Sequence, residues 1–356
     1  EALDTFTQTL TAVHKLLTQS DAASGETLMN ELETDLSQAR ALETAFRRMA
    51  LEPPARNDVL WREVRAVKGG IKVVFRCAPL TVAEFLQTRL FERRPGTVLC
   101  SATLQVGTSF DYFRSVVGLD TGFDAWPIEE QEIPSPFFYD EQCVVLSWEA
   151  PVDVSDPKYP QELAELIDSL TDQIQRRLLV LFTSYAQLRA VHEVLHSRLF
   201  HSERRLLTQF SRTSRRALLA AFKESPRAIL LGTASFWEGV DLPGDLLEMI
   251  IVARLPFANP TEPVVAARME YLQEQGGNPF MEYQIPDAIT RFRQGFGRLI
   301  RTTYDEGIFI VADSRVTQRR YGQLFLDALP VEAIPFRYVD RIVNLVAKRL
   351  FQGDRS

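Results

Sequence analysis

Apolar positions along the first hundred residues follow two different spacings, one typical of helices and one typical of strands. Residues 2–17 and 28–49 place apolar side chains at alternating intervals of three and four, which predicts two amphipathic helices. The turn-like sequence SDAASGE at 20–26 separates them, so we expect an antiparallel helical hairpin. Two further apolar runs flank KGG at 68–70 and predict a β-hairpin, and TVLCSATL at 97–104 predicts a buried strand that ends in a polar loop.

From about residue 140, short apolar runs alternate with amphipathic helical segments. The runs are CVVLSW, LLVLFT, RLLTQF, AILLGT, MIIVARL and GIFIVAD, and GIFIVAD at 307–313 is the last clear strand. Strands separated by helices predict a parallel α/β sheet flanked by helices. In such sheets ligands sit beyond the carboxyl ends of the strands, where this chain places its polar, glycine-containing loops.

The pattern divides the chain into three expected parts: a helical hairpin (1–55), a short β segment (56–104) and the α/β domain (105–356). The chain starts at Glu1, inside an expected helix and without methionine, so we expect a piece of a longer protein. No apolar run approaches the roughly 20 residues of a membrane span, so no membrane partner is expected. The net charge of −7 excludes a uniformly basic coat for nucleic acid but permits a local basic groove.

The loop GTASFWEGVDLPG at 232–244 follows an expected strand and offers several groups that bind phosphate or sugar. The hydroxyls of Thr233 and Ser235, with backbone N–H groups, suit phosphate oxygens. Two carboxylates flank a glycine in EGVD at 238–241, and one of them can accept from a ribose hydroxyl. A ligand-free crossover turn is the alternative. The two aromatic residues of the loop, FW at 236–237, can stack on a base, although core packing is the more common outcome.

The sequence QGFGRLIR at 294–301 places Arg298 and Arg301 three residues apart, on one side of an expected helical turn. Two guanidinium groups that close repel each other unless an anion lies between them, and together they can brace a transferring phosphoryl group. Gly297 removes a side chain beside Arg298, which would let another surface come close. The alternative is a basic helix end on a solvated face.

A different chemistry is indicated by HEVLH at 192–196, which matches the H-E-x-x-H zinc pattern. His192 and His196 can share a metal, with Glu193 as general base of a zinc metallohydrolase. The extended pattern fails, because Leu199 and Ser202 stand where it needs a glycine and a third histidine. The apolar spacing around HEVLH also fits an ordinary amphipathic helix on a sheet.

Taken together, the loops resemble the motifs of superfamily 2 helicases, most closely the DinG/XPD-like branch. SATL (101–104) resembles motif III and VLFTSY (180–185) resembles motif IV. GTASFWEGVDLPG with the following IIVARLPFANPTEPVV (250–265) is similar to the motif V region, and QGFGRLIR matches motif VI. The resemblance runs from about 95 to 320. It implies that 1–55 is part of an arch-like insertion, that 56–104 is the tail of a first motor domain, and that 105–356 is a RecA-like second motor domain.

The resemblance further implies an ATP-dependent DNA helicase that tracks single-stranded DNA 5′ to 3′. Arg298 and Arg301 would approach the β/γ-phosphates as arginine-finger and sensor groups, and Gln294 would report the γ-phosphate. Asp241 would meet the ribose, while Glu238 and Gly239 would line the nucleotide cleft. The phosphates of the DNA strand would be held by Thr183, Ser184, Thr233 and Ser235, and Thr103 would couple the two motor halves.

The chain departs from the family pattern in lacking G-x-x-x-x-G-K-[ST] and D-E-x-H, which supply the phosphate cradle and the magnesium carboxylate. ATP and Mg²⁺ would therefore be bound mainly by a first motor domain that this chain does not include. Cys77, Cys100 and Cys143 form no CxxC pair, so an iron–sulfur cluster is not expected in this chain. We expect a cytoplasmic bacterial protein, with the chain alone inactive as an ATPase. A nucleic-acid-binding module that has lost motor chemistry is a third hypothesis.

Overall fold

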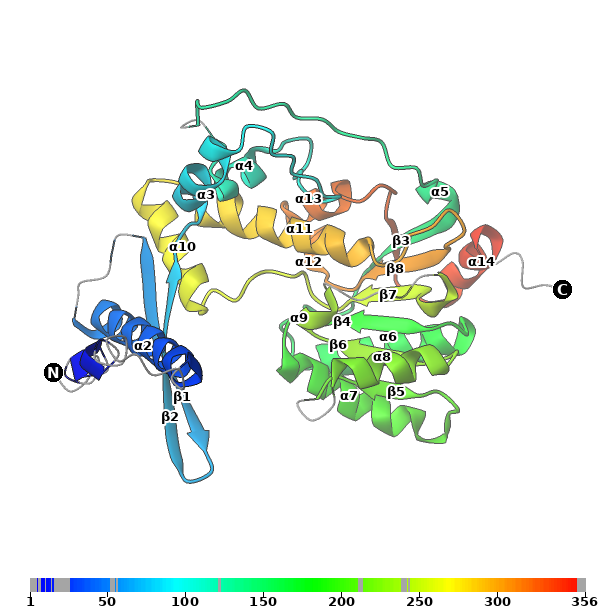
Figure 1. Cartoon of the computed structure of the whole chain (residues 1–356). Coiled ribbons are helices and arrows are strands. Elements are labelled where there is room, and N and C mark those ends of the chain that lie inside the picture. Colours follow the sequence, from blue (N-terminus) through cyan, green and yellow to red (C-terminus); the bar gives the residue numbers. More distant parts are fainter. Residues whose placement is uncertain are drawn as a thin grey trace. The chain divides into compact units, whose positions relative to one another are not determined.

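The computed structural model describes residues 5, 8–9, 11–13, 15, 26–51, 55, 57–120, 123–210, 214–237, 242 and 244–350. Contacts between residues divide the chain into two compact units (Figure 1). The first unit consists of Glu1–Val82 with Pro260–Tyr271, and the second consists of Ala83–Asn259 with Leu272–Ser356.

The described part of the first unit contains a long helix and the expected β-hairpin. Strands β1 (Asp58–Val67) and β2 (Gly70–Pro79) pair antiparallel through their whole length, so the predicted hairpin is confirmed. The turn between them needs a left-handed backbone at Gly69, where φ is 96°. The unit also holds most of α10 (Pro263–Glu274), and Arg268 of this helix donates to the carbonyl oxygen of Leu80 at 2.8 Å.

The helix predicted at 28–49 is confirmed by α2 (Glu26–Phe46), which continues as the π-helical segment η1 (Arg47–Leu51). Leu36 and Ala39 on this helix are buried, whereas Leu42 and Phe46, which belong to the same apolar spacing, are exposed. The partner helix predicted at 2–17 and the turn at 20–26 fall largely outside the described residues.

The second unit is built on a seven-stranded sheet in the order β5-β6-β4-β7-β8-β3-β9, and every strand pair in it is parallel. The strands are β3 (Cys143–Trp148), β4 (Leu178–Leu181), β5 (Leu206–Thr208), β6 (Ile229–Gly232), β7 (Met249–Val252), β8 (Gly307–Val311) and β9 (Ile334–Phe336). All residues of β3, β4, β6, β7 and β8 are buried. Burial on both faces explains why these strands are continuous apolar runs, and it confirms the predicted parallel α/β sheet.

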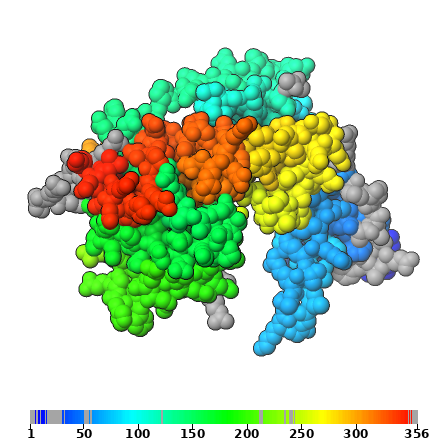
Figure 2. All heavy atoms as spheres, turned by 180° about the vertical axis from the view of Figure 1, so that it is seen from behind, coloured from blue at the N-terminus to red at the C-terminus, as the bar shows by residue number. Residues whose placement is uncertain are grey.

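Helices cover both faces of this sheet. One apolar core joins the sheet to α6 (Tyr159–Gln173), α7 (Tyr185–Arg198) and α14 (Asp340–Arg349). The other core joins it to α8 (Arg215–Glu224), α11 (Ile285–Phe296) and α13 (Gly322–Asp327). Gln173 at the end of α6 donates to Asp340 at the start of α14 at 2.8 Å, and Figure 2 shows the C-terminal segment in red against the green part of the chain.

The remaining helical segments are short. They are α3 (Ala83–Arg89), η2 (Phe91–Arg93), α4 (Asp111–Val117), α5 (Tyr139–Gln142), η3 (Leu199–His201), α9 (Ala234–Trp237), η4 (Gly244–Leu246), η5 (Phe280–Gln284) and α12 (Arg315–Gln318).

Two sequence predictions about strands are wrong. Residues 97–104 form no strand, and Val98 is 84% exposed. A buried strand needs neighbours for its backbone hydrogen bonds, and no strand in the described part of the chain pairs with this segment. The run at 307–313 is not the last strand, because β9 (Ile334–Phe336) pairs with β3. Three residues that include Pro335 are too short a run to show a period.

Candidate functional site

Parallel strands bring several polar loops to one edge of the sheet. Strand β6 lies between β5 and β4, so the residues that follow these three strands meet at their carboxyl ends. We call this set of polar side chains the carboxyl-edge cluster; its members are Ser184, Tyr185, Gln209, Thr233 and Ser235.

Gln209, which directly follows β5, connects this cluster through its carboxamide. Its Oε1 accepts from the backbone N–H of Thr233 at 2.8 Å and from the Thr233 hydroxyl at 2.9 Å. Its Nε2 donates to Oγ of Ser235 at 2.9 Å and to the hydroxyl of Tyr185 at 3.2 Å. One side chain therefore fixes the loops that follow β4 and β6.

The expected DNA-binding residues take different positions at this edge. Thr233 is 4% exposed and directs both of its donors at Gln209, whereas Ser235 is exposed. Ser184 caps α7, since its Oγ accepts from the backbone N–H of Gln187 at 3.3 Å. Thr183 is partly buried beside it.

The aromatic residues of the same loop do not face solvent. Phe236 is fully buried and Trp237 is 4% exposed, so core packing is confirmed and base stacking by either ring is excluded in this structure. The indole N–H of Trp237 donates to the carbonyl oxygen of Phe182 at 3.3 Å. A Cβ atom at Gly232 would lie 2.6 Å from the ring of Phe236, so the glycine makes room for this packing.

The two arginines of QGFGRLIR lie in a turn and not in a helix. Helix α11 ends at Phe296, so the predicted helical turn through Arg298 and Arg301 is wrong. We call the segment from Gly297 to Glu306 the arginine turn. It leads into the amino end of β8, while the carboxyl-edge cluster follows the carboxyl ends of other strands. The Nε atom of Arg298 donates to the carbonyl oxygen of Trp237 at 3.4 Å.

A buried carboxylate holds the arginine turn. Asp305 accepts from the backbone N–H of Arg301 at 2.7 Å, and from the N–H and hydroxyl of Thr302 at 2.9 and 2.6 Å. Gln142, directly before β3, donates to the carbonyl oxygens of Thr302 and Asp305, each at 2.9 Å. These bonds fix the backbone at Arg301.

The glycine that permits close packing is not the one that the sequence indicated. Gly297 is exposed, and a Cβ atom there would have only an ordinary contact of 3.4 Å with the carbonyl oxygen of Arg293. A Cβ atom at Gly295 would lie 3.0 Å from the ring of Trp237. Within this chain, the close approach between motif VI and motif V therefore occurs at Gly295, and the role expected of Gly297 stays a prediction.

Gln294, in the last turn of α11, has a polar atom without a partner. Its Oε1 is buried and accepts no hydrogen bond from any described residue. A buried carbonyl oxygen without a donor costs free energy, so this atom suits a ligand or a protein group that brings a donor. Glu238, Gly239 and Asp241, expected at the nucleotide, lie outside the described residues.

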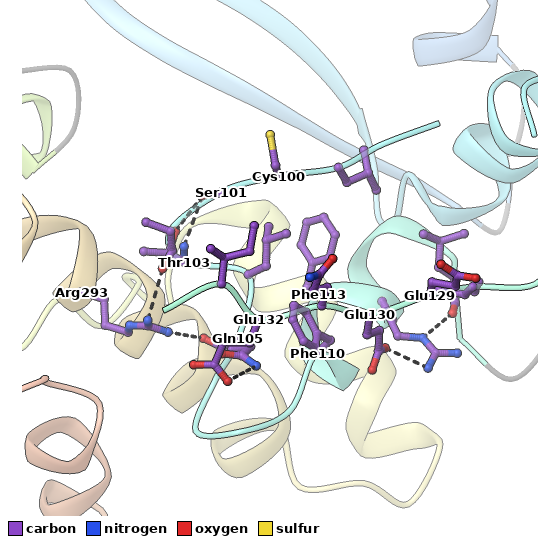
Figure 3. A pocket seen from close by; sticks show the side chains of 18 of the residues that line it. Cys100, Ser101, Thr103, Gln105, Phe110, Phe113, Glu129, Glu130, Glu132 and Arg293 are labelled. Carbon is purple, nitrogen blue, oxygen red and sulfur yellow. Dashed lines mark hydrogen bonds and ion pairs between the residues drawn. The ribbon is translucent and has the colours of Figure 1, made fainter. Parts of the chain in front are cut away.

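The SAT loop is bound to α11 by Arg293. Its guanidinium donates to the carbonyl oxygen of Gln105 at 2.7 Å and to that of Ala102 at 3.2 Å (Figure 3). Burial lowers the pKa of Arg293, and the charge of Glu132 opposes this effect. The hydroxyl oxygen of Thr103 is 3.3 Å from that of Ser101. Thr103 and Arg293 both line a cavity of about 850 Å³.

The helix with HEVLH fits the amphipathic alternative. His192 Nδ1 lies 2.8 Å from the hydroxyl of Thr208, and its ring packs edge-on against Phe210. Burial lowers the pKa of His192, and the charge of His196 lowers it further. Among the residues that the structure describes, no three His, Cys, Asp or Glu side chains are grouped to hold a metal ion.

Four residues with clear structural roles or open bonding capacity were not among the predicted site residues: Gln209, Arg254, Arg293 and Asp305. Arg254 follows β7, the strand that lies between β4 and β8 in the sheet. Its side chain is partly buried and forms no ion pair or hydrogen bond with the described residues. The feature of the sequence that could have identified Arg254 is its position after a strand, and the same holds for Gln209. Arg293 carries no such signal, because only the fold brings near the carbonyl oxygens of Gln105 and Ala102. Asp305 binds groups three and four residues before it, and no motif in the sequence pointed to it. Among the described residues, no helix combines the length and the apolar character that crossing a membrane requires.

Comparisons with known proteins show that the chain is similar to helicases. The family model described as helicase C-terminal domain matches residues 167–332. The chain is 39% identical to a Bacillus subtilis protein named 3′-5′ exonuclease DinG, over 78% of this chain and 30% of that protein. It is 32% identical to the ATP-dependent DNA helicase DinG of Photobacterium profundum, over 93% of this chain and 48% of that protein.

A third relative is the ATP-dependent DNA helicase YoaA of Escherichia coli, 35% identical over 76% of this chain and 41% of that protein. The chain thus spans less than half the length of these relatives. A solved XPD helicase structure covers 91% of this chain and 55% of its own with a TM-score of 0.57 and 12% identity, which supports the RecA-like fold. The chain matches the C-terminal portion of DinG-like helicases of superfamily 2.

Proposed function

We propose that the chain supplies the second motor domain of an ATP-dependent 5′-to-3′ DNA helicase in the bacterial cytoplasm. The observation that carries the proposal is the construction of motif VI. Asp305 and Gln142 fix the arginine turn, and Gln294 beside it has a buried oxygen without a donor. Relatives with the same C-terminal portion are named ATP-dependent DNA helicases.

In this proposal the arginine turn faces the terminal phosphates of ATP. Arg298 and Arg301 serve as the finger and sensor groups, and Gln294 reports the γ-phosphate. A guanidinium presents planar paired donors, which match phosphate oxygens better than a point charge does. The nucleotide and Mg²⁺ supply the phosphoryl group and the cation that neutralises it. Both are held mainly by a first motor domain of the same polypeptide, with Glu238, Gly239 and Asp241 completing the cleft from this chain.

The carboxyl edge is proposed to carry single-stranded DNA. Ser184, Ser235 and Thr183 offer hydroxyl groups to backbone phosphates, and the burial of Thr233 gives it the role of holding its loop. Arg254 adds a partly buried cation whose guanidinium forms no ion pair within the described structure. Thr103 and the SAT loop, bound to α11 by Arg293, couple the two motor halves.

A comparison of the chain with the full-length parent protein tests the proposal. The parent should hydrolyse ATP in a DNA-stimulated manner and unwind a duplex with a 5′ single-stranded tail. The chain alone should have no appreciable ATPase or unwinding activity, because it has neither the phosphate loop nor the acidic box. Robust DNA-stimulated hydrolysis by the purified chain would contradict this division of labour. So would a parent that neither hydrolyses ATP nor binds single-stranded DNA.

A further inference from the structure

Gln209 contacts groups of two kinds, and the difference fixes the direction of every hydrogen bond that its carboxamide forms. The backbone N–H of Thr233, at 2.8 Å, can only donate. The carboxamide atom that faces it must therefore be the carbonyl oxygen. The amide nitrogen then faces Ser235 and Tyr185, at 2.9 and 3.2 Å.

An amide NH₂ group donates and cannot accept, so both hydroxyl oxygens must accept from Gln209. Each hydroxyl has a single hydrogen, and neither hydrogen can point at the amide. Ser235 is exposed and Tyr185 is 54% exposed, so both hydrogens are available to a ligand in solvent. Gln209 thereby turns two hydroxyl groups into outward donors.

The adjacent strand end supplies a third donor of the same kind. The Oγ atom of Ser184 accepts from the backbone N–H of Gln187, which leaves the hydroxyl hydrogen of Ser184 to donate. Ser184 and Tyr185 follow β4, and Ser235 follows its neighbour β6. Three neutral donors therefore lie at one stretch of the sheet edge.

We propose that Gln209 is a positioning residue that directs the hydroxyl hydrogens of Tyr185 and Ser235 toward the backbone phosphates of single-stranded nucleic acid. The inference rests on the proposed DNA track and adds how its donors are oriented. Phosphodiester oxygens accept and never donate, so a site in which all free hydroxyl hydrogens point outward is complementary to them. Contacts to phosphate carry no base information, so the site binds without sequence preference.

Replacing Gln209 by glutamate tests the direction of these bonds with almost no change in shape. A carboxylate still accepts from both donors of Thr233, but it has no hydrogen to give to Tyr185 or Ser235. Their hydroxyls would turn inward and donate to the carboxylate, and the phosphate would lose both donors. Gln175→Glu is a matched control, because Gln175 is exposed before the amino end of β4 and the charge change is the same.

The experiment measures binding of a fluorescently labelled oligothymidylate to this chain at low salt, by anisotropy. Gln209→Glu should weaken binding by about tenfold or more, since two hydrogen bonds to a charged group are lost. Gln175→Glu should change the affinity less than about twofold, as expected for an exposed charge remote from the proposed DNA-binding site. Tyr185→Phe should weaken binding in the wild-type background and have no further effect in Gln209→Glu, where the hydroxyl already points inward. The salt dependence should be the same for Tyr185→Phe as for wild type, because a neutral contact releases no counterion.

Each outcome has a definite meaning. Unchanged affinity of Gln209→Glu, or additive effects of the two substitutions, would overturn the positioning role while leaving the DNA track intact. If Gln209→Glu does not fold, Tyr185→Phe and Ser235→Ala decide, and normal binding by both would overturn the role. A wild-type chain that binds no oligothymidylate at any salt concentration would instead contradict the proposed DNA track.

Discussion

The carboxyl-edge cluster and the arginine turn are both proposed to meet phosphate, but they would do so by different physical means. The cluster offers neutral hydroxyl groups whose direction is set by one carboxamide that joins three strand ends. The turn offers guanidinium groups on a backbone held by a carboxylate four residues further on. Neutral donors suit a polymer that must slide, because each contact is weak. Fixed cations suit charge that develops in a transition state. Substitutions in the two regions should therefore change different measurements.

The largest effect is expected at the arginine turn. In the full-length parent, Arg298→Ala and Arg301→Ala should each lower ATP turnover by about 10³–10⁵-fold, the usual contribution of an arginine finger. Lysine should restore little, and the double variant should be far from additive because both groups serve one phosphoryl group. The measurement is steady-state ATPase with saturating single-stranded DNA, beside DNA binding without nucleotide, which should stay near normal.

Arg291→Ala is the matched control for these variants. Arg291 lies in α11, just before the arginine turn, and its side chain is 41% exposed and pairs with Asp287. Normal hydrolysis by both arginine variants would make motif VI a surface segment. Loss of DNA binding would move the arginines to the DNA track and remove the distinction between the two regions.

The next effect concerns the carboxylate under the turn. Asp305→Ala in this chain should lower the free energy of unfolding by about 1–3 kcal/mol, since buried N–H groups lose their acceptor. Urea denaturation measures it, with Asp327→Ala as control, because Asp327 is exposed on α13. In the parent, Asp305→Ala should also lower ATP turnover while DNA binding without nucleotide stays normal. An unchanged urea midpoint would show that the turn does not depend on Asp305.

A smaller effect is expected from the single cation proposed at the carboxyl edge. Binding of single-stranded DNA by this chain should be weak and should fall with salt. Arg254→Ala should reduce the slope of log affinity against log salt by about 1, as for one lost phosphate contact. Lys223→Ala is the control, because Lys223 is exposed in the last turn of α8. An equal change of slope in both variants would mean that overall charge, and not a site at Arg254, governs binding.

The smallest effect is expected for helix α7, which contains HEVLH. His192 has a folded-state pKa below its ordinary value, so the unfolded chain binds its proton more readily. The contribution of neutral His192 to stability is present above the unfolded pKa of about 6.5 and is lost as the pH falls below it. His192→Gln should remove part of this acid sensitivity and leave stability at pH 8 nearly unchanged, as thermal melts at several pH values would show.

Replacing His192 and His196 together by Gln should leave the parent's ATPase nearly unchanged. Stoichiometric zinc in the purified protein, lost in that double variant, would instead support the zinc hydrolase alternative. It would also make this helix a third functional region.

The sequence by itself determined the parallel sheet, because strands buried on both faces must be apolar runs and their helices must show one apolar stripe. It also identified the helicase motifs and hence the arginine pair. Only the tertiary structure decided the contacts between them. Gln209 meets Thr233 because β5 and β6 are neighbours, and Gly295 meets Trp237 because α11 packs against α9. The apolar run at 97–104 has no strand to pair with among the described residues. Periodicity reports which side of an element is buried, whereas strand order and helix placement decide which side chains from distant segments share a hydrogen bond.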